Sequence, residues 1–188
     1  MMRAIKRSLW VFCGLLLAGG ALADTTVEGV TVPATRTVDG TTVKLNGVGL
    51  RTATMLKIKV YVMPLYLEEP SSDPAAIIDS TGAARIELHM LRDVGADDMR
   101  KAWDEGFEKN YTGSADLSAE LAALKKATSD LSEGDLMAFD FAGTTVTASH
   151  NGETTGTIEG AELRRALLSV WLGKKPPNKG LKEGILGQ

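Results

Sequence analysis

Strand patterns and helix patterns come in separate blocks along this chain, and their order restricts the folds that it can adopt. From Thr25 to Leu67, valines and threonines separated by glycine turns indicate β-strands. Another strand, helices, further strands and a last helix follow. Because strands and helices do not alternate strictly, the chain should form an α+β fold, a large antiparallel sheet with helices packed on one face.

The first block is predicted to be a meander. The pairs Asp39-Gly40 and Asn46-Gly47 are typical of tight turns between antiparallel strands. A long strand is expected from Met55 to Leu67, with Val60 on one side of the sheet and Tyr61 on the other. Every second side chain of this strand should therefore face the core.

The strand expected at residues 84–90 has the alternation of a half-buried strand. Ile86 and Leu88 alternate with Glu87 and His89. This pattern predicts one buried face.

The later blocks contain two amphipathic patterns. Met99, Trp103 and Phe107 recur every four residues with charges between them, which predicts a helix. Strands are expected at residues 136–142 and 145–149 and up to about Ile158. A final helix with an apolar face should end at Gly173.

The first 23 residues have the three parts of a cleavable signal peptide. Basic residues at positions 3, 6 and 7 precede an apolar stretch from Leu9 to Leu17, and Ala21-Leu22-Ala23 follows. The apolar stretch is about half of the roughly 20 residues that span a bilayer, so no stable membrane anchor is expected. We expect cleavage after Ala23, a single domain at residues 24–188, and a periplasmic or secreted protein.

The composition after cleavage excludes several kinds of site. Without the signal peptide the chain has 18 Lys and Arg against 24 Asp and Glu, a net charge of −6. A nucleic-acid partner would require a basic face, so none is expected. The single cysteine, Cys13, leaves with the signal peptide. No disulfide, thiol nucleophile or cysteine metal site is then possible, and we expect neither metal nor cofactor.

Common catalytic signatures are missing. Gly47-Val48-Gly49 begins like a dinucleotide-binding loop, but no helix follows, and these glycines are interpreted as turn residues. The only histidines, His89 and His150, are interpreted as structural or solvated. Asp97 and Asp98 could form a carboxylate pair, but their place in the first turn of a helix favours a role in stabilising the helix dipole.

One stretch runs from the glycine-rich turn ending at Arg51 through the long strand to Leu65-Tyr66-Leu67, and a late segment reads Val170-Trp171-Leu172-Gly173-Lys174. Together they resemble the chalcone isomerase family. The resemblance covers nearly all of residues 24–188 and is closest to exported bacterial members. It implies an open-faced β-sandwich in which helices cover one side of the sheet, with a ligand cleft between the two layers.

The resemblance leaves the ring-closing chemistry of plant chalcone isomerases incomplete. Those enzymes use an arginine in this turn, a threonine on the strand, and a tyrosine and an asparagine in the following helical region. Only the arginine is kept, as Arg51, while Tyr61 stands in the position of the threonine. The helical region offers acids near Asp98 and Glu105, and carboxylates oppose a developing enolate charge. No catalytic residue is therefore assigned.

The fatty-acid-binding relatives of these enzymes pair the turn arginine with a strand tyrosine, as Arg51 and Tyr61 do here. A guanidinium can hold a carboxylate with two hydrogen bonds and a phenol can donate a third. The resemblance therefore implies non-catalytic binding of a fatty acid or another small apolar carboxylate. Two alternatives remain: an isomerase or intramolecular lyase acting on an enone, and an accessory protein whose cleft is filled by side chains.

Overall fold

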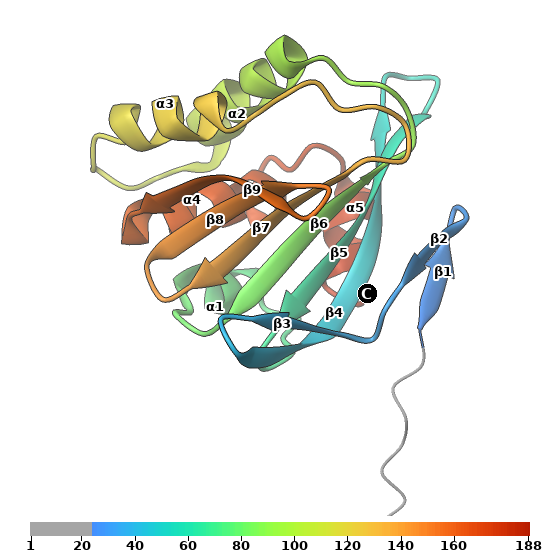
Figure 1. Ribbon diagram of the computed structural model, residues 1–188, viewed down its shortest axis with the longest axis horizontal. Helices are drawn as coiled ribbons and strands as arrows, with labels where there is room; N and C mark the ends of the chain where they lie inside the picture. The colour runs from blue at the N-terminus through green and yellow to red at the C-terminus, as the bar shows by residue number, and fades with distance from the viewer. Residues whose placement is uncertain (1–23) are drawn as a thin grey trace, which may run out of the picture.

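The computed structural model describes residues 24–188, and the predicted signal peptide lies outside the described residues. Seven strands form one curled antiparallel sheet in chain order, which confirms the predicted α+β architecture (Figure 1). They are β3 (Thr35–Val38), β4 (Thr41–Ala53), β5 (Ile58–Leu67), β6 (Ala84–Met90), β7 (Leu136–Ala142), β8 (Thr145–His150) and β9 (Glu153–Glu159). Two short strands, β1 (Thr25–Val27) and β2 (Val30–Val32), form a separate hairpin.

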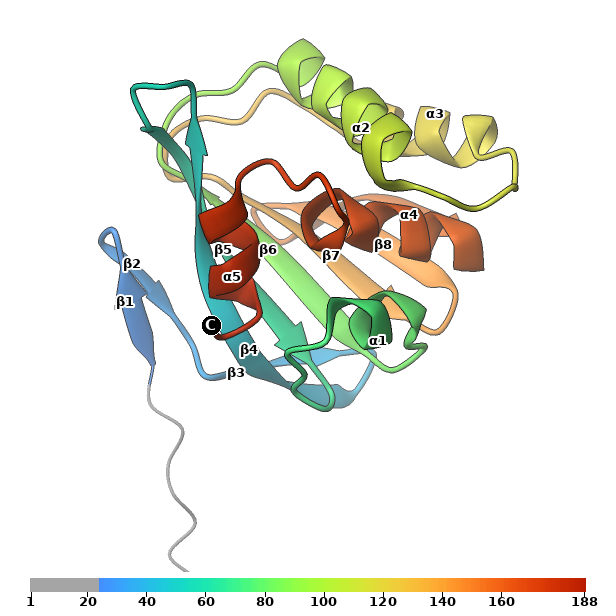
Figure 2. The same ribbon diagram turned by 180° about the vertical axis from the view of Figure 1, so that it is seen from behind.

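Five helices accompany the sheet. They are α1 (Pro74–Asp79), α2 (Ala96–Asn110), α3 (Ser118–Lys126), α4 (Ala161–Leu172) and α5 (Lys179–Ile185). Helices α1, α4 and α5 lie against one face of the sheet, and α2 packs over α4 (Figure 2). The main core forms between this face and the helices.

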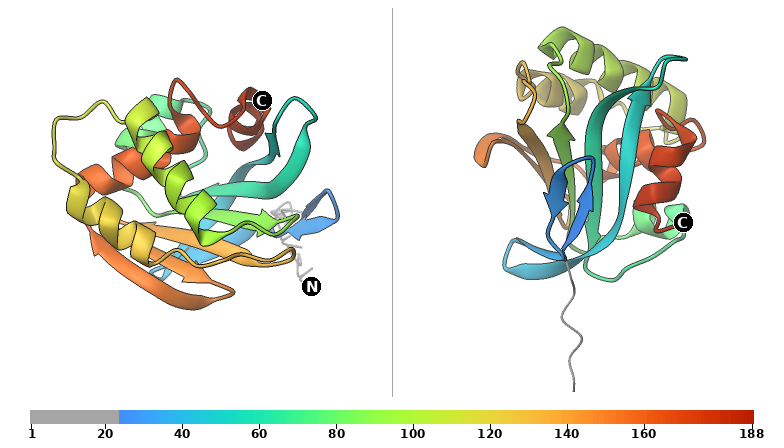
Figure 3. Two further views of the ribbon diagram at one scale, coloured as in Figure 1. Left: turned by 90° about the horizontal axis from the view of Figure 1, so that it is seen from above. Right: turned by 90° about the vertical axis from the view of Figure 1, so that its right-hand side faces the viewer.

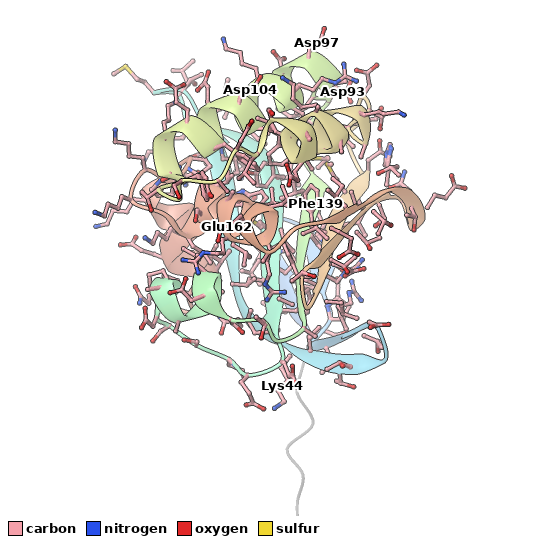
Figure 4. The ribbon with its side chains drawn as sticks, turned by 90° about the vertical axis from the view of Figure 1, so that its left-hand side faces the viewer. Lys44, Asp93, Asp97, Asp104, Phe139 and Glu162 are labelled. Atoms are coloured by element: carbon pink, nitrogen blue, oxygen red, sulfur yellow. The ribbon has the colours of Figure 1, made fainter. Side chains whose placement is uncertain are left out.

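Three aromatic side chains connect the layers of the core. The Trp103 ring lies 5.6 Å from the Phe139 ring and 5.8 Å from the Trp171 ring, both in edge-on geometry. These rings come from α2, β7 and α4, and Phe139 points into the interior (Figure 4). Edge-to-face aromatic pairs of this kind add about 0.5 to 1.5 kcal/mol each beyond their buried area.

The β1–β2 hairpin covers part of the opposite face of the sheet (Figure 3). Val32 of the hairpin joins a small apolar cluster with Val43, Val62 and Tyr66. Val62 and Tyr66 alternate along β5 with Met63 and Leu65, which belong to the main core. From Tyr61 to Leu67, strand β5 is therefore buried on both faces.

The strand predicted from Met55 begins only at Ile58. Residues 54–57 form the turn between β4 and β5, in which Thr54 and Lys57 have φ angles of 61° and 52°. A strand cannot continue through two left-handed residues, which the sequence pattern did not reveal because neither of them is a glycine. This part of the prediction was wrong.

The predicted turn at Asn46-Gly47 was also wrong, since both residues lie inside β4. Asn46 is an extra residue in the register between β4 and β5, a β-bulge. A Cβ atom on Gly47 would lie 2.3 Å from the carbonyl oxygen of Gly184, and one on Gly49 would lie 2.3 Å from that of Leu181. These glycines permit close packing of α5 on β4, and do not form a turn.

The side of β6 that carries Glu87 is also covered, which the alternation alone does not predict. This carboxylate is fully buried and accepts hydrogen bonds of 2.7 Å from Arg36 Nε and 2.7 Å from Arg85 Nε. Burial alone would raise the pKa of Glu87, but hydrogen bonds from His89, Arg36 and Arg85 outweigh it and lower the pKa to about 2. An ion-paired network therefore replaces solvent on this side of the strand.

Candidate ligand-binding site

A cavity of about 490 Å³ lies between the sheet and the helices. It is bounded by the paired ends of β4 and β5, by α2 and α4, and by the connection from α4 to α5. Most of its wall is apolar, as a site for a largely apolar ligand requires. The apolar lining residues are Ala53, Val60, Val94, Met99, Ala102, Trp103, Val170, Trp171, Pro176 and Pro177.

Arg51 and Tyr61 both line this cavity. They are direct partners across the antiparallel pair of β4 and β5, so their backbones lie opposite each other. Val60 is an extra residue in the register, because Arg51 pairs with Tyr61 while Thr52 pairs with Lys59. This bulge brings Val60 and Tyr61, expected on opposite sides of the sheet, to the same cavity.

The Tyr61 hydroxyl lies at the buried end of the wall. Its oxygen accepts a hydrogen bond of 3.1 Å from Trp171 Nε1, and the side chain is 7 % exposed. Desolvation raises the pKa of Tyr61 and outweighs the opposing effects of the Trp171 hydrogen bond and the Arg51 charge. The phenol therefore remains neutral near pH 7 and keeps a proton to donate. Within residues 24–188, the one hydrogen bond of this hydroxyl is the one it accepts from Trp171.

The Arg51 guanidinium is half-buried at the same wall. Its Nη1 group donates to the carbonyl oxygen of Thr52. Among the described residues it forms no ion pair, although a guanidinium has five donors in a planar fork. The arrangement leaves a cation and a neutral donor side by side on a mostly apolar cavity wall.

Four charged side chains also line the cavity, three of them from α2 and one from the connection between α4 and α5. Asp98 and Glu105, the acids expected in this region, do line the cavity, together with Lys109 and Lys175. Glu105 accepts a hydrogen bond of 2.7 Å from Lys109 Nζ, which lowers the pKa of this carboxyl. Lys109 and Lys175 were not predicted, because no sequence pattern distinguishes a lysine that lines a cavity from one on an ordinary surface.

Asn110, also missed, fastens the connection between α4 and α5 to the end of α2. The nitrogen of the buried Asn110 side-chain amide donates a hydrogen bond of 3.0 Å to the carbonyl oxygen of Lys175. The amide oxygen accepts one of 2.8 Å from the backbone N–H of Lys175. The amide is therefore occupied with shaping the cavity wall.

The other residues considered from sequence lie elsewhere. His89 contacts Glu87 and His150 contacts Asp135. Asp97 lies in the first turn of α2 and projects into solvent (Figure 4). Across residues 24–188, no cluster of three or more potential ligands could hold a metal ion, and no helix is long and apolar enough to cross a bilayer.

Comparison with known proteins agrees with this architecture. A family described as chalcone isomerase-like matches residues 24–187. A solved fatty-acid-binding protein from Arabidopsis thaliana superposes with a TM-score of 0.70 at 16 % identity, covering 87 % of this chain and 96 % of that one. No curated protein matches the sequence. Since the family match spans the whole described domain, the chain belongs to the chalcone isomerase-like family.

Proposed function

We propose that this protein is exported and binds a fatty acid or another small apolar carboxylate in the cavity, without catalysing a reaction. The observation that carries the proposal is the pairing of Arg51 with Tyr61 on the wall of an otherwise largely apolar cavity. The ligand carboxylate would contact these two side chains. Its apolar tail would lie against residues such as Met99 and Trp103.

The chemistry of the two residues supports a carboxylate. A half-buried guanidinium without an anionic partner is costly, and a carboxylate matches its planar fork with two parallel hydrogen bonds. The neutral Tyr61 phenol supplies a third donor, and its raised pKa keeps this donor available over the physiological pH range. The rest of the wall offers burial to a hydrocarbon chain, worth about 0.8 kcal/mol per buried methylene group.

Two further observations support the class of ligand and the absence of catalysis. The structural neighbour from Arabidopsis thaliana is itself a fatty-acid-binding protein, although its likeness to this chain establishes the fold alone. Asp98 and Glu105 line the same cavity, and carboxylates, as acceptors, supply no hydrogen-bond donor to stabilise a developing enolate oxygen.

Export rests on the N-terminal pattern of basic residues, apolar stretch and Ala21-Leu22-Ala23. The protein recovered from its host should begin at Asp24 and remain in solution without detergent. N-terminal sequencing of the recovered protein tests this part separately. A membrane-bound product that retains Met1 would refute it.

Calorimetric titration with a long-chain fatty acid tests the binding site. Arg51→Ala should cost about 2 to 5 kcal/mol of binding free energy, because it removes a buried charged partner. Arg51→Lys should recover part of that loss, since an ammonium cannot reproduce the fork. Tyr61→Phe should cost about 0.5 to 1.5 kcal/mol, the worth of one hydrogen bond.

Two matched controls separate site effects from general effects of substitution. Arg92 is exposed and does not line the cavity, and Tyr111 is a half-buried tyrosine on another surface. Arg92→Ala and Tyr111→Phe should bind the fatty acid as tightly as the parent protein. Equal affinity in the parent and in all three site variants would show that neither Arg51 nor Tyr61 contacts the ligand.

A further inference from the structure

The exposed large apolar side chains of residues 24–188 all lie in one short segment, the turn between β4 and β5 and the first residue after it. We call residues 54–58 the hairpin tip. Met55 is 100 % exposed, Leu56 is 84 % exposed and Ile58 is 38 % exposed. The tip projects beyond the rest of the sheet (Figures 1 and 2). Grouped exposed apolar side chains on an otherwise polar surface mark an interaction site.

The tip has a defined turn geometry. Strand pairing continues to Ala53 and Ile58. The Lys57 N–H donates a hydrogen bond of 3.2 Å to the carbonyl oxygen of Thr54, and the Leu56 N–H donates one of 3.3 Å to Thr54 Oγ1. These bonds close the turn and leave Met55 and Leu56 at its apex with no protein side chains over them.

Two lysines follow the apolar apex in the chain. Lys57 lies within the tip and, among the described residues, forms no ion pair, while Lys59 pairs with Glu28 at 2.6 Å. Apolar side chains beside lysine are typical of segments that enter the boundary between lipid headgroups and acyl chains. A stable protein–protein interface has about 20 to 30 residues on each side, whereas only three large apolar residues are exposed at the tip.

We propose that the hairpin tip inserts Met55 and Leu56 into the surface of a lipid bilayer that contains anionic headgroups, with Lys57 contacting those headgroups. If the proposed function holds, the position of the hairpin tip next to the cavity explains what docking on a bilayer would achieve. Ala53 and Val60, which border the tip on either strand, line the cavity together with Arg51. A docked protein would therefore hold the cavity beside the bilayer, where an apolar carboxylate can leave or enter the lipid phase.

Flotation of the purified protein with vesicles tests the proposal. Phosphatidylcholine vesicles are compared with vesicles that also contain phosphatidylglycerol. The parent should float with the anionic vesicles, and replacing Met55 and Leu56 together by Ser should lower the partition coefficient at least about tenfold. Lys57→Glu should weaken binding to the anionic vesicles about tenfold, while Lys126→Glu on the surface of α3 should leave it unchanged.

The outcomes also separate this proposal from the proposed function. Fatty-acid titration without vesicles should give the same affinity for the parent and the double Ser variant, because the tip lies outside the cavity. A protein that floats as expected but binds no fatty acid would contradict the proposed function and leave docking supported. Equal flotation of the parent and the double Ser variant would overturn docking. Docking would also be overturned if the parent bound no vesicles but self-associated, and the double Ser variant did not self-associate. The tip would then be assigned to a contact between protein molecules.

Discussion

The Trp171 indole nitrogen donates a hydrogen bond of 3.1 Å to the hydroxyl oxygen of Tyr61. Both side chains are buried, and the bond joins α4 to β5 at the wall of the cavity. The same contact sets the position of the phenol relative to Arg51, its partner across the strands. Tyr61 therefore has two roles, one in the stability of the domain and one in the proposed site.

Tyr61→Phe should destabilise the domain as well as weaken ligand binding. The variant leaves the Trp171 N–H buried without an acceptor, which costs about 1 to 3 kcal/mol. Urea unfolding of the ligand-free protein measures this loss. Tyr111→Phe, which removes a part-buried hydrogen bond to Glu162, should cost less than about 1 kcal/mol, because the Glu162 carboxylate keeps access to water. Equal midpoints for the parent and Tyr61→Phe would contradict the role of this bond.

The packing of α5 on β4 can be tested with two glycines of the same helix. A Cβ atom on Gly184 would lie 2.5 Å from the carbonyl oxygen of Val48, a backbone atom that cannot easily move, so Gly184→Ala should destabilise by about 1 to 3 kcal/mol. A Cβ atom on Gly180 would meet only the Asn178 side chain, at 3.9 Å. Gly180→Ala should therefore stabilise by up to about 1 kcal/mol. Thermal unfolding that ranks the two variants in the reverse order would refute the close contact.

Glu87 should make stability depend on pH in the acid range. Its pKa is about 2 in the folded protein against an ordinary value of 4.5, so the ionised carboxylate stabilises the fold fully above pH 4.5. This contribution is lost as the pH falls from 4.5 to 2. At neutral pH, Glu87→Gln should lower the free energy of unfolding by about 3 kcal/mol, because each unit of the pKa difference corresponds to about 1.36 kcal/mol.

The difference in unfolding free energy between the parent and Glu87→Gln should shrink steadily below pH 4.5. Urea unfolding at a series of pH values measures it. A difference that is the same at pH 7 and pH 2.5 would show that the charge of Glu87 contributes nothing and that only the shape of the side chain matters.

The protein should not convert chalcone to flavanone above the uncatalysed rate. Its cavity combines Arg51 and Tyr61 with the carboxylates of Asp98 and Glu105, and the Asn110 amide is already bonded to the backbone of Lys175. Absorbance assays with purified protein check this expectation. Turnover that Arg51→Ala abolishes would instead identify an enzyme.

Much of the fold could be predicted from local patterns. The strand at residues 84–90 and the end of α4 before Gly173 follow from alternation and from a helix stop, because both signals lie within a few residues of the elements they define. The placing of Arg51 and Tyr61 as possible site residues came from resemblance to a family. Spacing alone would not have brought them to one cavity.

The features that were missed depend on contacts between distant segments. Helix α5 is short, and it can pack on β4 because Gly47 and Gly49 have no side chains. These glycines lie more than 130 residues before their contacts in α5. The burial of Glu87 was not predicted, since nothing near it in the chain shows that Arg36, 51 residues earlier, will meet it. The bulge at Val60, which brings Tyr61 to the cavity, likewise appears only when β4 and β5 pair.

A crystal structure of the protein with a bound long-chain fatty acid would show whether Arg51 and Tyr61 hold the ligand. The carboxylate should lie within hydrogen-bonding distance of the Arg51 guanidinium and the Tyr61 hydroxyl, with the hydrocarbon chain extending along Met99 and Trp103. A carboxylate held instead by Lys109 or Lys175, or a fatty acid bound outside this cavity, would contradict it.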